Sequence, residues 1–383
     1  MPRQASLRVM AVGDSVTQGA PARPSWRYGF QARVRRSGCA IDMVGPDTIL
    51  RSGASASKLR PGLDHDHSAR GGRTSAEILA GTSRWIGLLK PEVIIVHAGV
   101  NDLTRGLSPN RAADNVASLI RQARAANPDV AVMVTRPAAP AARVRAETVL
   151  LGNSISSMAK RVGTGRSPVV VVDQATGWNL DRFTVEGDTS HPNRKGEEKI
   201  AQRYAEEFLA LDRCRASQQG DHRGPARTGW LTVKAEGSAV RLRWGRVSDP
   251  SGGVRYMIRR DGVALTHTSA NTLLVRNSSA NATYAVVAVD GRGNVGGVRA
   301  HSANAQGVVI EAGGSTCRVA SDNGTVTIRW SGQGRGDIWR NGQAIGASTG
   351  GLWVEPERQS GTTHYSVALG DGIKRYCGNI TQL

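Results

Sequence analysis

A serine follows the first predicted strand of the chain, in the tripeptide Gly13-Asp14-Ser15. If residues 7–12 form a strand of a parallel sheet, Ser15 lies at the carboxyl edge of that sheet, where such folds place their active sites. A serine hydroxyl is a weak nucleophile and requires a general base within hydrogen-bonding distance. The tripeptide alone is common and is also compatible with an ordinary helix N-cap, so other polar segments must decide between the two interpretations.

Two further polar segments occur at comparable places. Asn101 and Asp102 follow a predicted strand at residues 93–97, and Asp188 and His191 precede the last predicted helix of this region. An aspartate three residues before a histidine can fold back onto the imidazole and hold its tautomer, as the acid does in a Ser-His-Asp arrangement. This histidine can then act as the general base that the serine requires.

Together with Gly72, these segments form four blocks in the order found in SGNH (GDSL-type) hydrolases, and the chain resembles that family over them. The resemblance implies a serine esterase in which Ser15 is the nucleophile, His191 the general base and Asp188 its partner. It also implies an oxyanion hole formed by the backbone N–H groups of Ser15 and Gly72 and by the side-chain amide of Asn101. No cofactor and no metal are expected.

Asp14 and Asp102 lie in the same blocks and are interpreted as supports of the site. We expect Asp14 to accept hydrogen bonds from the loop backbone and to orient the turn that carries Ser15. The alternative, in which Asp14 is the acid of the triad, is disfavoured because its position next to the serine directs it away from the imidazole.

Within residues 7–211 the chain resembles one group of these hydrolases more specifically. Segments 42–46, 167–179 and 191–193 look like acetylxylan-esterase-type members of carbohydrate esterase family 3. This implies metal-free hydrolysis of acetyl esters on a polysaccharide such as acetylated xylan. Arg73 departs from the family, which often has a small or aromatic residue after the glycine of the second block. Its side chain either helps to bind an anionic sugar such as a uronate or is simply solvated.

Short apolar segments alternate with helical ones up to about residue 211. Amphipathic helices are predicted at residues 111–126 and 197–211, and strands at residues 7–12, 41–44, 93–97, 130–135 and 169–173. This alternation predicts a parallel sheet covered by helices on both faces. The predicted catalytic domain is therefore α/β, with the three-layer α/β/α architecture and flavodoxin-like parallel sheet of SGNH hydrolases.

Beyond this region the pattern changes to the two-residue period of half-buried antiparallel strands. Trp244 and Trp330 begin two similar segments, which continue to Tyr284 and Tyr365 and indicate a tandem repeat. Both resemble fibronectin type III domains, the second in degenerate form, so two all-β immunoglobulin-like sandwiches are expected. The predicted organisation is a catalytic domain at 1–212, a linker at 213–226 and β-modules at 227–306 and 307–383.

The chain contains four cysteines. Cys317 and Cys377 bracket the last module near its first and final strands, and a disulfide between them is predicted. Such a bridge argues for an oxidising compartment, so an extracellular location, secreted or at the cell surface, is expected although no signal peptide is recognisable at the start of the chain. Cys39 and Cys214 show no metal-binding spacing and are predicted to be free thiols.

The net charge is +19, and the excess of basic residues is spread along the chain. A basic surface can hold anionic polymers, but no run of Lys and Arg typical of nucleic-acid-binding arms is present, and no nucleic-acid partner is expected. No stretch approaches the run of about 20 apolar residues that spans a membrane. The expected partner is an acetylated polysaccharide or a small acyl ester, with carbohydrate or cell-wall contact through the β-modules. A monomer is favoured.

Two other features resemble binding sites. Residues 64–67 alternate aspartate and histidine, as some metal sites do, but are interpreted as a solvated polar patch. Trp26 and Trp178 could stack on sugars, although core or rim packing is the simpler interpretation.

Two other functions remain open at this stage. One is a lipid esterase, lysophospholipase or thioesterase on the same fold, which the arginines near the blocks disfavour because long acyl chains require an apolar groove. The other is a cell-surface or virion adhesion protein in which the β-modules bind and the hydrolase is vestigial. The intact set of serine, asparagine, aspartate and histidine argues against that loss of activity.

Overall fold

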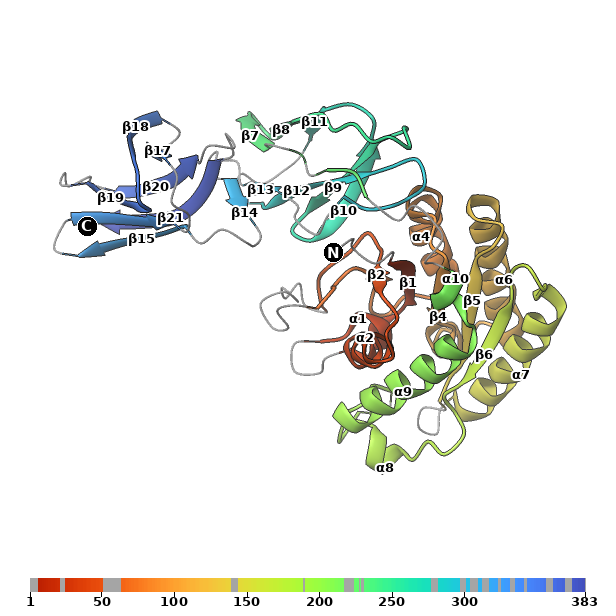
Figure 1. Ribbon diagram of the computed structural model, residues 1–383. Coiled ribbons are helices and arrows are strands. Elements are labelled where there is room, and N and C mark those ends of the chain that lie inside the picture. The colour runs from red at the N-terminus through yellow and green to blue at the C-terminus, as the bar shows by residue number, and fades with distance from the viewer. Residues whose placement is uncertain are drawn as a thin grey trace. The chain divides into compact units, whose positions relative to one another are not determined.

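The chain forms two compact units, Met1–Arg223 with Arg292–Asn294, and Gly224–Gly291 with Val295–Leu383 (Figure 1). The computed structural model describes residues 6–20, 25–50, 63–138, 144–188, 190–216, 224–226, 228, 231–276, 282–296, 301–303, 309–311, 317–322, 325–330, 335–340, 343–355, 361–368 and 374–382.

A parallel sheet forms the centre of the first unit. Its strand order is β2-β1-β4-β5-β6, and the short β3 pairs with the end of β1. The strands are β1 (Leu7–Gly13), β2 (Ile41–Met43), β3 (Ser68–Ala69), β4 (Val93–His97), β5 (Ala131–Arg136) and β6 (Val169–Asp173). All five predicted strands are confirmed. The two-residue β3 was not predicted because it has no apolar pattern.

Helices cover both faces of this sheet, as predicted (Figure 1). The described helices are α1 (Ser15–Gln18), α2 (Trp26–Arg36), α4 (Ser75–Leu89), α5 (Val100–Thr104), α6 (Pro109–Ala126), α7 (Arg145–Val162), α8 (Leu180–Phe183), α9 (Arg194–Ala210) and α10 (Arg213–Ala216). Helices α2 and α9 pack together on one face, and α4, α6 and α7 follow one another on the other. This arrangement leaves the carboxyl ends of the strands, where the polar blocks lie, at one edge of the sheet.

Aromatic side chains fill the layer between the sheet and the α2–α9 pair. Trp26 is buried against Tyr204, with ring centroids 4.3 Å apart, and Phe30 meets Phe208 edge to face. Trp26 is therefore a core residue and not a sugar-stacking surface. Trp178 is half-buried and packs beside Phe183 of α8.

A disulfide joins Cys39, which precedes β2, to Cys214 on α10. The prediction that these two cysteines are free is wrong. They are 175 residues apart in the chain. Only the packing of the last helices against the start of β2 brings them together, so their spacing gave no signal. Helix α10 also occupies the first four residues of the predicted linker.

The second unit consists of antiparallel sheets, as the two-residue period predicts. The first two have the orders β10-β9-β12-β13-β14 and β11-β8-β7, and the last two have the orders β15-β16-β19 and β18-β17-β20-β21. The strands are β7 (Leu231–Glu236), β8 (Ala239–Trp244), β9 (Arg255–Arg260), β10 (Val263–Thr268), β11 (Thr272–Val275), β12 (Tyr284–Val289), β13 (His301–Ala303), β14 (Val309–Glu311), β15 (Cys317–Asp322), β16 (Thr325–Trp330), β17 (Gly336–Arg340), β18 (Gln343–Ser348), β19 (Leu352–Glu355), β20 (Gly361–Ala368) and β21 (Lys374–Gln382).

The two tryptophans that begin the sequence repeat are core residues of this unit. Trp244 packs edge to face on Tyr256 in one apolar cluster, and Trp330 lies in a second cluster with Tyr365. Cys317 is disulfide-bonded, whereas the side chain of Cys377 lies outside the described residues. The pairing of these two cysteines thus stays a prediction.

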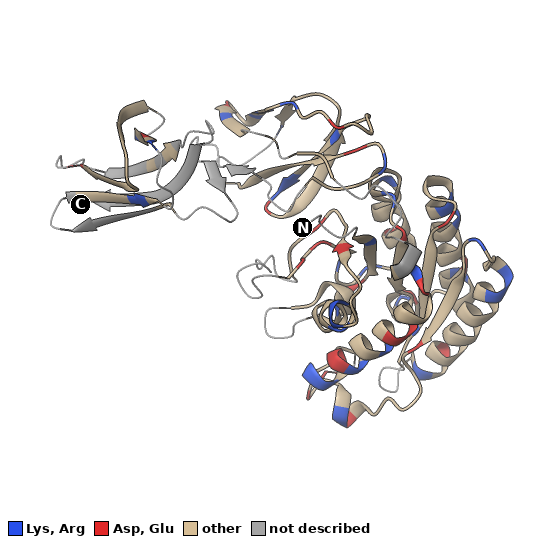
Figure 2. Ribbon diagram, in the orientation of Figure 1, with Lys and Arg blue, Asp and Glu red and all other residues tan. Residues whose placement is uncertain are grey.

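Charged residues are distributed over many elements of both units, with acidic side chains among the basic ones (Figure 2). In the part of the chain that the structure describes, no helix has the length and apolar character needed to cross a bilayer.

Candidate active site

Ser15 lies in a tight turn between β1 and α1. The turn requires glycine at position 13, because a Cβ there would come within 2.5 Å of the His97 carbonyl oxygen. Asp14 caps α1, and its Oδ1 accepts a hydrogen bond from the Val16 N–H at 3.0 Å. The Ser15 N–H belongs to the first residue of α1, where helical N–H groups have no intrahelical acceptor.

His191 connects Ser15 to Asp188. Its Nε2 lies 2.9 Å from Ser15 Oγ, and its Nδ1 lies 2.7 Å from Asp188 Oδ2. The other carboxylate oxygen of Asp188 accepts the backbone N–H groups of Ser190, at 2.8 Å, and of His191, at 3.1 Å. The structure thus brings together three side chains from opposite ends of the catalytic unit.

The environment of Asp188 favours its charged form. Partial burial raises the pKa of this carboxyl, but hydrogen bonds from the Ser190 N–H and from the His191 ring and backbone outweigh it and lower the pKa to about 2. An ionised carboxylate on Nδ1 holds the proton there, so that Nε2 can accept a proton from Ser15.

The loop that carries His191 is held at the start of α9. The backbone carbonyl of His191 accepts the Val185 N–H at 3.0 Å. Asn193 caps α9, because its Oδ1 accepts the N–H groups of Lys195 and Gly196. The Asn193 amide also donates to the Thr184 carbonyl at 2.8 Å. These bonds fix the loop that carries His191 directly before α9 begins.

Gly72 carries a backbone N–H that no described residue accepts. It has a positive φ of +77°, a conformation that favours glycine. Neighbouring N–H groups all have acceptors, namely Arg70 to Gly13 O (3.1 Å), Gly71 to Gln18 Oε1 (2.9 Å), Arg73 to Arg70 O (3.4 Å) and Thr74 to Glu77 Oε2 (2.8 Å). The segment lies next to the serine, since a Cβ on Gly71 would be 3.4 Å from Ser15 Cβ.

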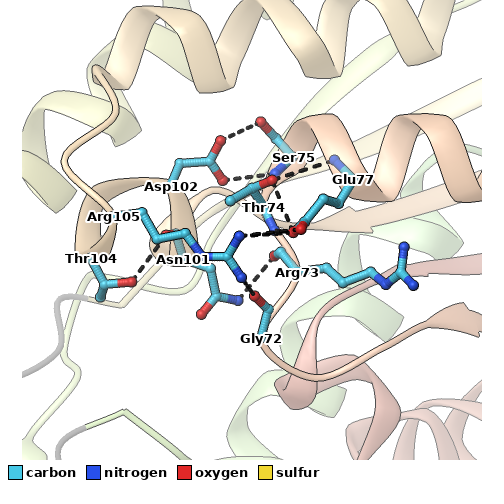
Figure 3. Close-up of polar contacts among 9 residues, drawn as sticks. All are labelled: Gly72, Arg73, Thr74, Ser75, Glu77, Asn101, Asp102, Thr104 and Arg105. Atoms are coloured by element: carbon cyan, nitrogen blue, oxygen red, sulfur yellow. Dashed lines mark hydrogen bonds and ion pairs between the residues drawn. The ribbon is translucent and has the colours of Figure 1, made fainter.

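Asn101 is the second residue of α5 and reaches between the other two blocks. Its Nδ2 donates to Arg73 O at 3.0 Å (Figure 3). It also donates to Asp14 Oδ2 at 3.3 Å. The backbone carbonyl of Asn101 accepts the Thr104 hydroxyl. The side-chain amide therefore contacts both the turn that carries Ser15 and the segment that carries Gly72.

The two predicted supporting aspartates have different environments. Asp102 is fully buried and accepts both the N–H and the hydroxyl of Ser75, at 2.7 and 2.6 Å, which ties α5 to the start of α4 (Figure 3). Asp14 is also buried, and burial raises its pKa to about 7 against the hydrogen bond from Val16. The imidazole nitrogen that a triad acid would contact is bonded to Asp188.

Arg73 contributes its backbone to the site. Its carbonyl oxygen accepts the Asn101 amide, while its side chain extends away from that amide (Figure 3). The guanidinium lies beside Gly81 of α4, 3.7 Å from where a Cβ on that glycine would be. An interaction of Arg73 with an anionic sugar stays a prediction.

Residues 64–67 form structural contacts between loops. His67 is fully buried, with Nε2 2.9 Å from the Ile49 carbonyl and Nδ1 accepting the Ala69 N–H at 3.1 Å. Asp64 accepts the Met43 N–H at 2.9 Å. The prediction of a solvated patch is wrong, because both ends of the segment satisfy backbone groups of neighbouring loops. Within the described ranges, no group of three or more His, Cys, Asp or Glu is placed to hold a metal ion.

Sequence reasoning missed two residues that contact the glycine segment. Gln18 accepts the Gly71 N–H, and Arg105 donates to the Gly72 carbonyl at 2.7 Å. Both are polar residues a few positions after a block, Gln18 after Ser15 and Arg105 after Asn101. That proximity is the one signal the sequence contains, and many surface residues share it.

The model of the GDSL-like Lipase/Acylhydrolase family matches residues 11–199. This range contains all four polar blocks and most of the sheet. The first unit contains a GDSL/SGNH hydrolase domain. The chain is accordingly a carboxylic ester hydrolase.

The GDSL domain is similar in fold to several solved esterases. A carbohydrate esterase family 3 structure from Talaromyces cellulolyticus is 25% identical with a TM-score of 0.48, over 54% of this chain and 98% of that one. A family 3 carbohydrate esterase from Clostridium thermocellum is 24% identical with a TM-score of 0.46, over 56% and 99%. An acetyl xylan esterase, AlAXEase, is 16% identical with a TM-score of 0.40, over 54% and 100%. A search of curated proteins found no match.

If Asn101 is the oxyanion donor that the resemblance implies, replacing it by alanine is expected to lower kcat by about 10²–10³-fold, the usual cost of losing one such donor. Because the side chain is only half-buried, the melting temperature should change little. The measurement is steady-state hydrolysis of nitrophenyl acetate together with a thermal melt. Asn110→Ala is the matched control, since it removes an exposed amide bonded to Ser154 on the helices α6 and α7. Unchanged turnover in the Asn101 variant would remove this residue from the site.

Proposed function

We propose that the GDSL domain hydrolyses short-chain O-acyl esters, acetyl esters above all, through an acyl-enzyme on Ser15. The observation that carries the proposal is the hydrogen-bonded series from Ser15 Oγ to His191 Nε2, at 2.9 Å, and from His191 Nδ1 to Asp188, at 2.7 Å. A nucleophile, a base and a carboxylate that orients the base are the parts that acyl transfer requires.

In the proposed reaction, Ser15 Oγ attacks the ester carbonyl while His191 Nε2 takes the hydroxyl proton. The N–H groups of Ser15 and Gly72 donate to the oxyanion of the tetrahedral intermediate. The Asn101 amide donates to it as well, in exchange for its 3.3 Å bond to Asp14 Oδ2. His191 then gives its proton to the departing alcohol, which leaves the acyl group on the serine. A water molecule, deprotonated by the same imidazole, attacks the acyl-enzyme and releases the acid.

We propose an acetylated polysaccharide such as xylan as the substrate. The resemblance of three segments to carbohydrate esterase family 3 supports this class. Three polar side chains that hydrogen-bond to the block segments, Gln18, Asn101 and Arg105, support a short acyl group. A long acyl chain would require an apolar groove instead.

Acyl-chain profiling tests the proposal. Nitrophenyl esters of two to twelve carbons should give the highest kcat/KM at two carbons, at least about tenfold above eight carbons, because a polar site cannot bury further methylene groups. Acetate release from acetylated xylan and other acetylated glycans should accompany it and disappear in Ser15→Ala. A maximum at eight carbons or more would favour the lipid esterase alternative. Cleavage of nitrophenyl acetate without acetate release from any glycan would reject the polysaccharide.

We further propose an extracellular location, supported by the Cys39–Cys214 bridge and by the disulfide-bonded Cys317. The β-modules are proposed to be fibronectin type III-like adaptors that contact carbohydrate or cell wall. The pairing of a three-stranded and a larger antiparallel sheet around a buried tryptophan supports such a sandwich. Retention of the full-length Ser15→Ala variant on insoluble polysaccharide would support the adaptor role, and its absence would leave a spacer.

A further inference from the structure

Arg105 connects the third block of the site to the second. It directly follows α5, and its Nη2 donates to the Gly72 carbonyl at 2.7 Å (Figure 3). Its Nη1 lies 3.2 Å from each carboxylate oxygen of Glu77. One planar guanidinium therefore contacts a backbone carbonyl and a carboxylate at the same time.

Glu77 is itself held in place at the start of α4. Its Oε2 accepts the N–H of Thr74 at 2.8 Å and the hydroxyl of the same residue at 3.1 Å, which completes the capping box of the helix. The Thr74 N–H and the Arg105 guanidinium lower the pKa of Glu77, so the carboxylate stays charged. The Arg105 guanidinium is thus bonded to the first turn of α4 through Glu77 and to the Gly72 carbonyl at the same time.

The peptide group between Gly71 and Gly72 carries the Gly72 N–H, and the peptide groups before and after it are both fixed by hydrogen bonds from side chains. The Gly71 N–H is bonded to Gln18 on one side, and the Gly72 carbonyl is bonded to Arg105 on the other. A Cβ added to Gly72 would have no atom within 4 Å, so side-chain packing does not restrain this residue. Two consecutive glycines have wide conformational freedom, and hydrogen bonds must therefore set the direction of the N–H between them.

We propose that Arg105 is a positioning residue of the oxyanion hole, which holds the Gly72 carbonyl so that the N–H of the same residue faces the oxyanion. This inference rests on the role proposed above for Gly72. Arg105 acts through the backbone of Gly72 and not through the substrate. The donor must be preorganised, because a donor that has to reorient during the reaction loses most of its effect.

Arginine suits this position because its fork can serve two acceptors in one plane. A lysine keeps the charge but donates from a single nitrogen and lacks the planar fork that serves both acceptors. Arg105→Lys is therefore expected to be intermediate between the wild type and Arg105→Ala. The side chain is about half exposed, so its replacement leaves no buried cavity.

The test compares Arg105→Ala with Arg166→Ala as the matched control. Arg166 forms a similar exposed bidentate pair, with Asp129, but at the amino edge of the sheet, opposite the serine. We expect kcat for nitrophenyl acetate to fall about 10- to 50-fold in Arg105→Ala, a part of the loss for removing a donor outright, with KM within about twofold. The control should keep wild-type kcat, and the two melting temperatures should be similar.

Chemical rescue separates positioning from a structural role. Guanidinium at millimolar concentration should restore part of kcat in Arg105→Ala, whereas sodium at equal ionic strength should not. A fall in melting temperature with kcat unchanged would overturn the proposal, as would a rise in KM with kcat unchanged. Loss of kcat without rescue by guanidinium, and without an intermediate value in Arg105→Lys, would also overturn it. If Ser15→Ala and Asn101→Ala stay active as well, the proposed site itself fails; if they do not, only the role of Arg105 fails.

Discussion

The Ser15→Ala variant is expected to lose ester hydrolysis almost completely, with kcat about 10⁶-fold lower, since the proposed mechanism makes Ser15 the nucleophile and its loss in a serine hydrolase typically costs this much. The variant lacks the oxygen that is proposed to attack the ester, whereas the proposed oxyanion donors stay in place. Those donors retain a small activity over the uncatalysed rate. Initial rates with nitrophenyl acetate at high enzyme concentration measure the loss, and the fold should be unaffected because only a partly exposed hydroxyl is removed.

His191→Ala and the double variant provide the control for this prediction. Ser15 and His191 are 2.9 Å apart and are proposed to act as one unit, so the double variant should be hardly slower than either single variant. If the fold-losses in kcat of the two single variants multiply in the double variant, the two side chains act independently. A Ser15→Ala variant with a tenth of wild-type kcat or more would show that the nucleophile lies elsewhere.

Much of the catalytic unit could be predicted from the sequence because its signals are local. The buried runs of β4 and β6 have the composition of strands covered on both faces, and both lie where they were predicted. The polar blocks end strands or precede a helix, and a parallel sheet gathers such positions at one edge. The topology alone therefore places Ser15 near Asn101, although they are 86 residues apart.

The rest depended on contacts that have no local signal. Residues 64–67 have the composition of an exposed loop, and only the fold shows that His67 is buried under residues near Ile49. Gln18 and Arg105 act on the backbone of the glycine segment. A side chain that bonds a distant carbonyl leaves no pattern in the sequence, since many polar residues could do the same. The Cys39–Cys214 bridge was missed for this reason too.

The loss of that bridge is expected to be the largest effect on stability. A Cys39→Ala/Cys214→Ala variant should lose about 2–5 kcal/mol in the free energy of unfolding, since the bridge closes a loop of 175 residues. For a unit of this size the melting temperature should fall by roughly 5–15 °C. Differential scanning calorimetry measures the change, and alanine avoids burying a hydroxyl at position 39, where the cysteine is buried.

Activity separates this effect from damage to the site. Cys39 lies just before β2, at the amino edge of the sheet, whereas Ser15 lies at the carboxyl edge, so kcat at 25 °C should equal that of the wild type. Reductant should lower the melting temperature of the first unit in the wild type toward that in the variant. It should leave the melting of this unit in the variant unchanged, because the remaining disulfide-bonded Cys317 lies in the second unit. A wild-type melt that is insensitive to reductant, with a variant melting within about 2 °C of it, would mean that the bridge contributes nothing to stability. Because a reducing compartment would remove this stabilisation, a large effect would also support the proposed location outside the cell.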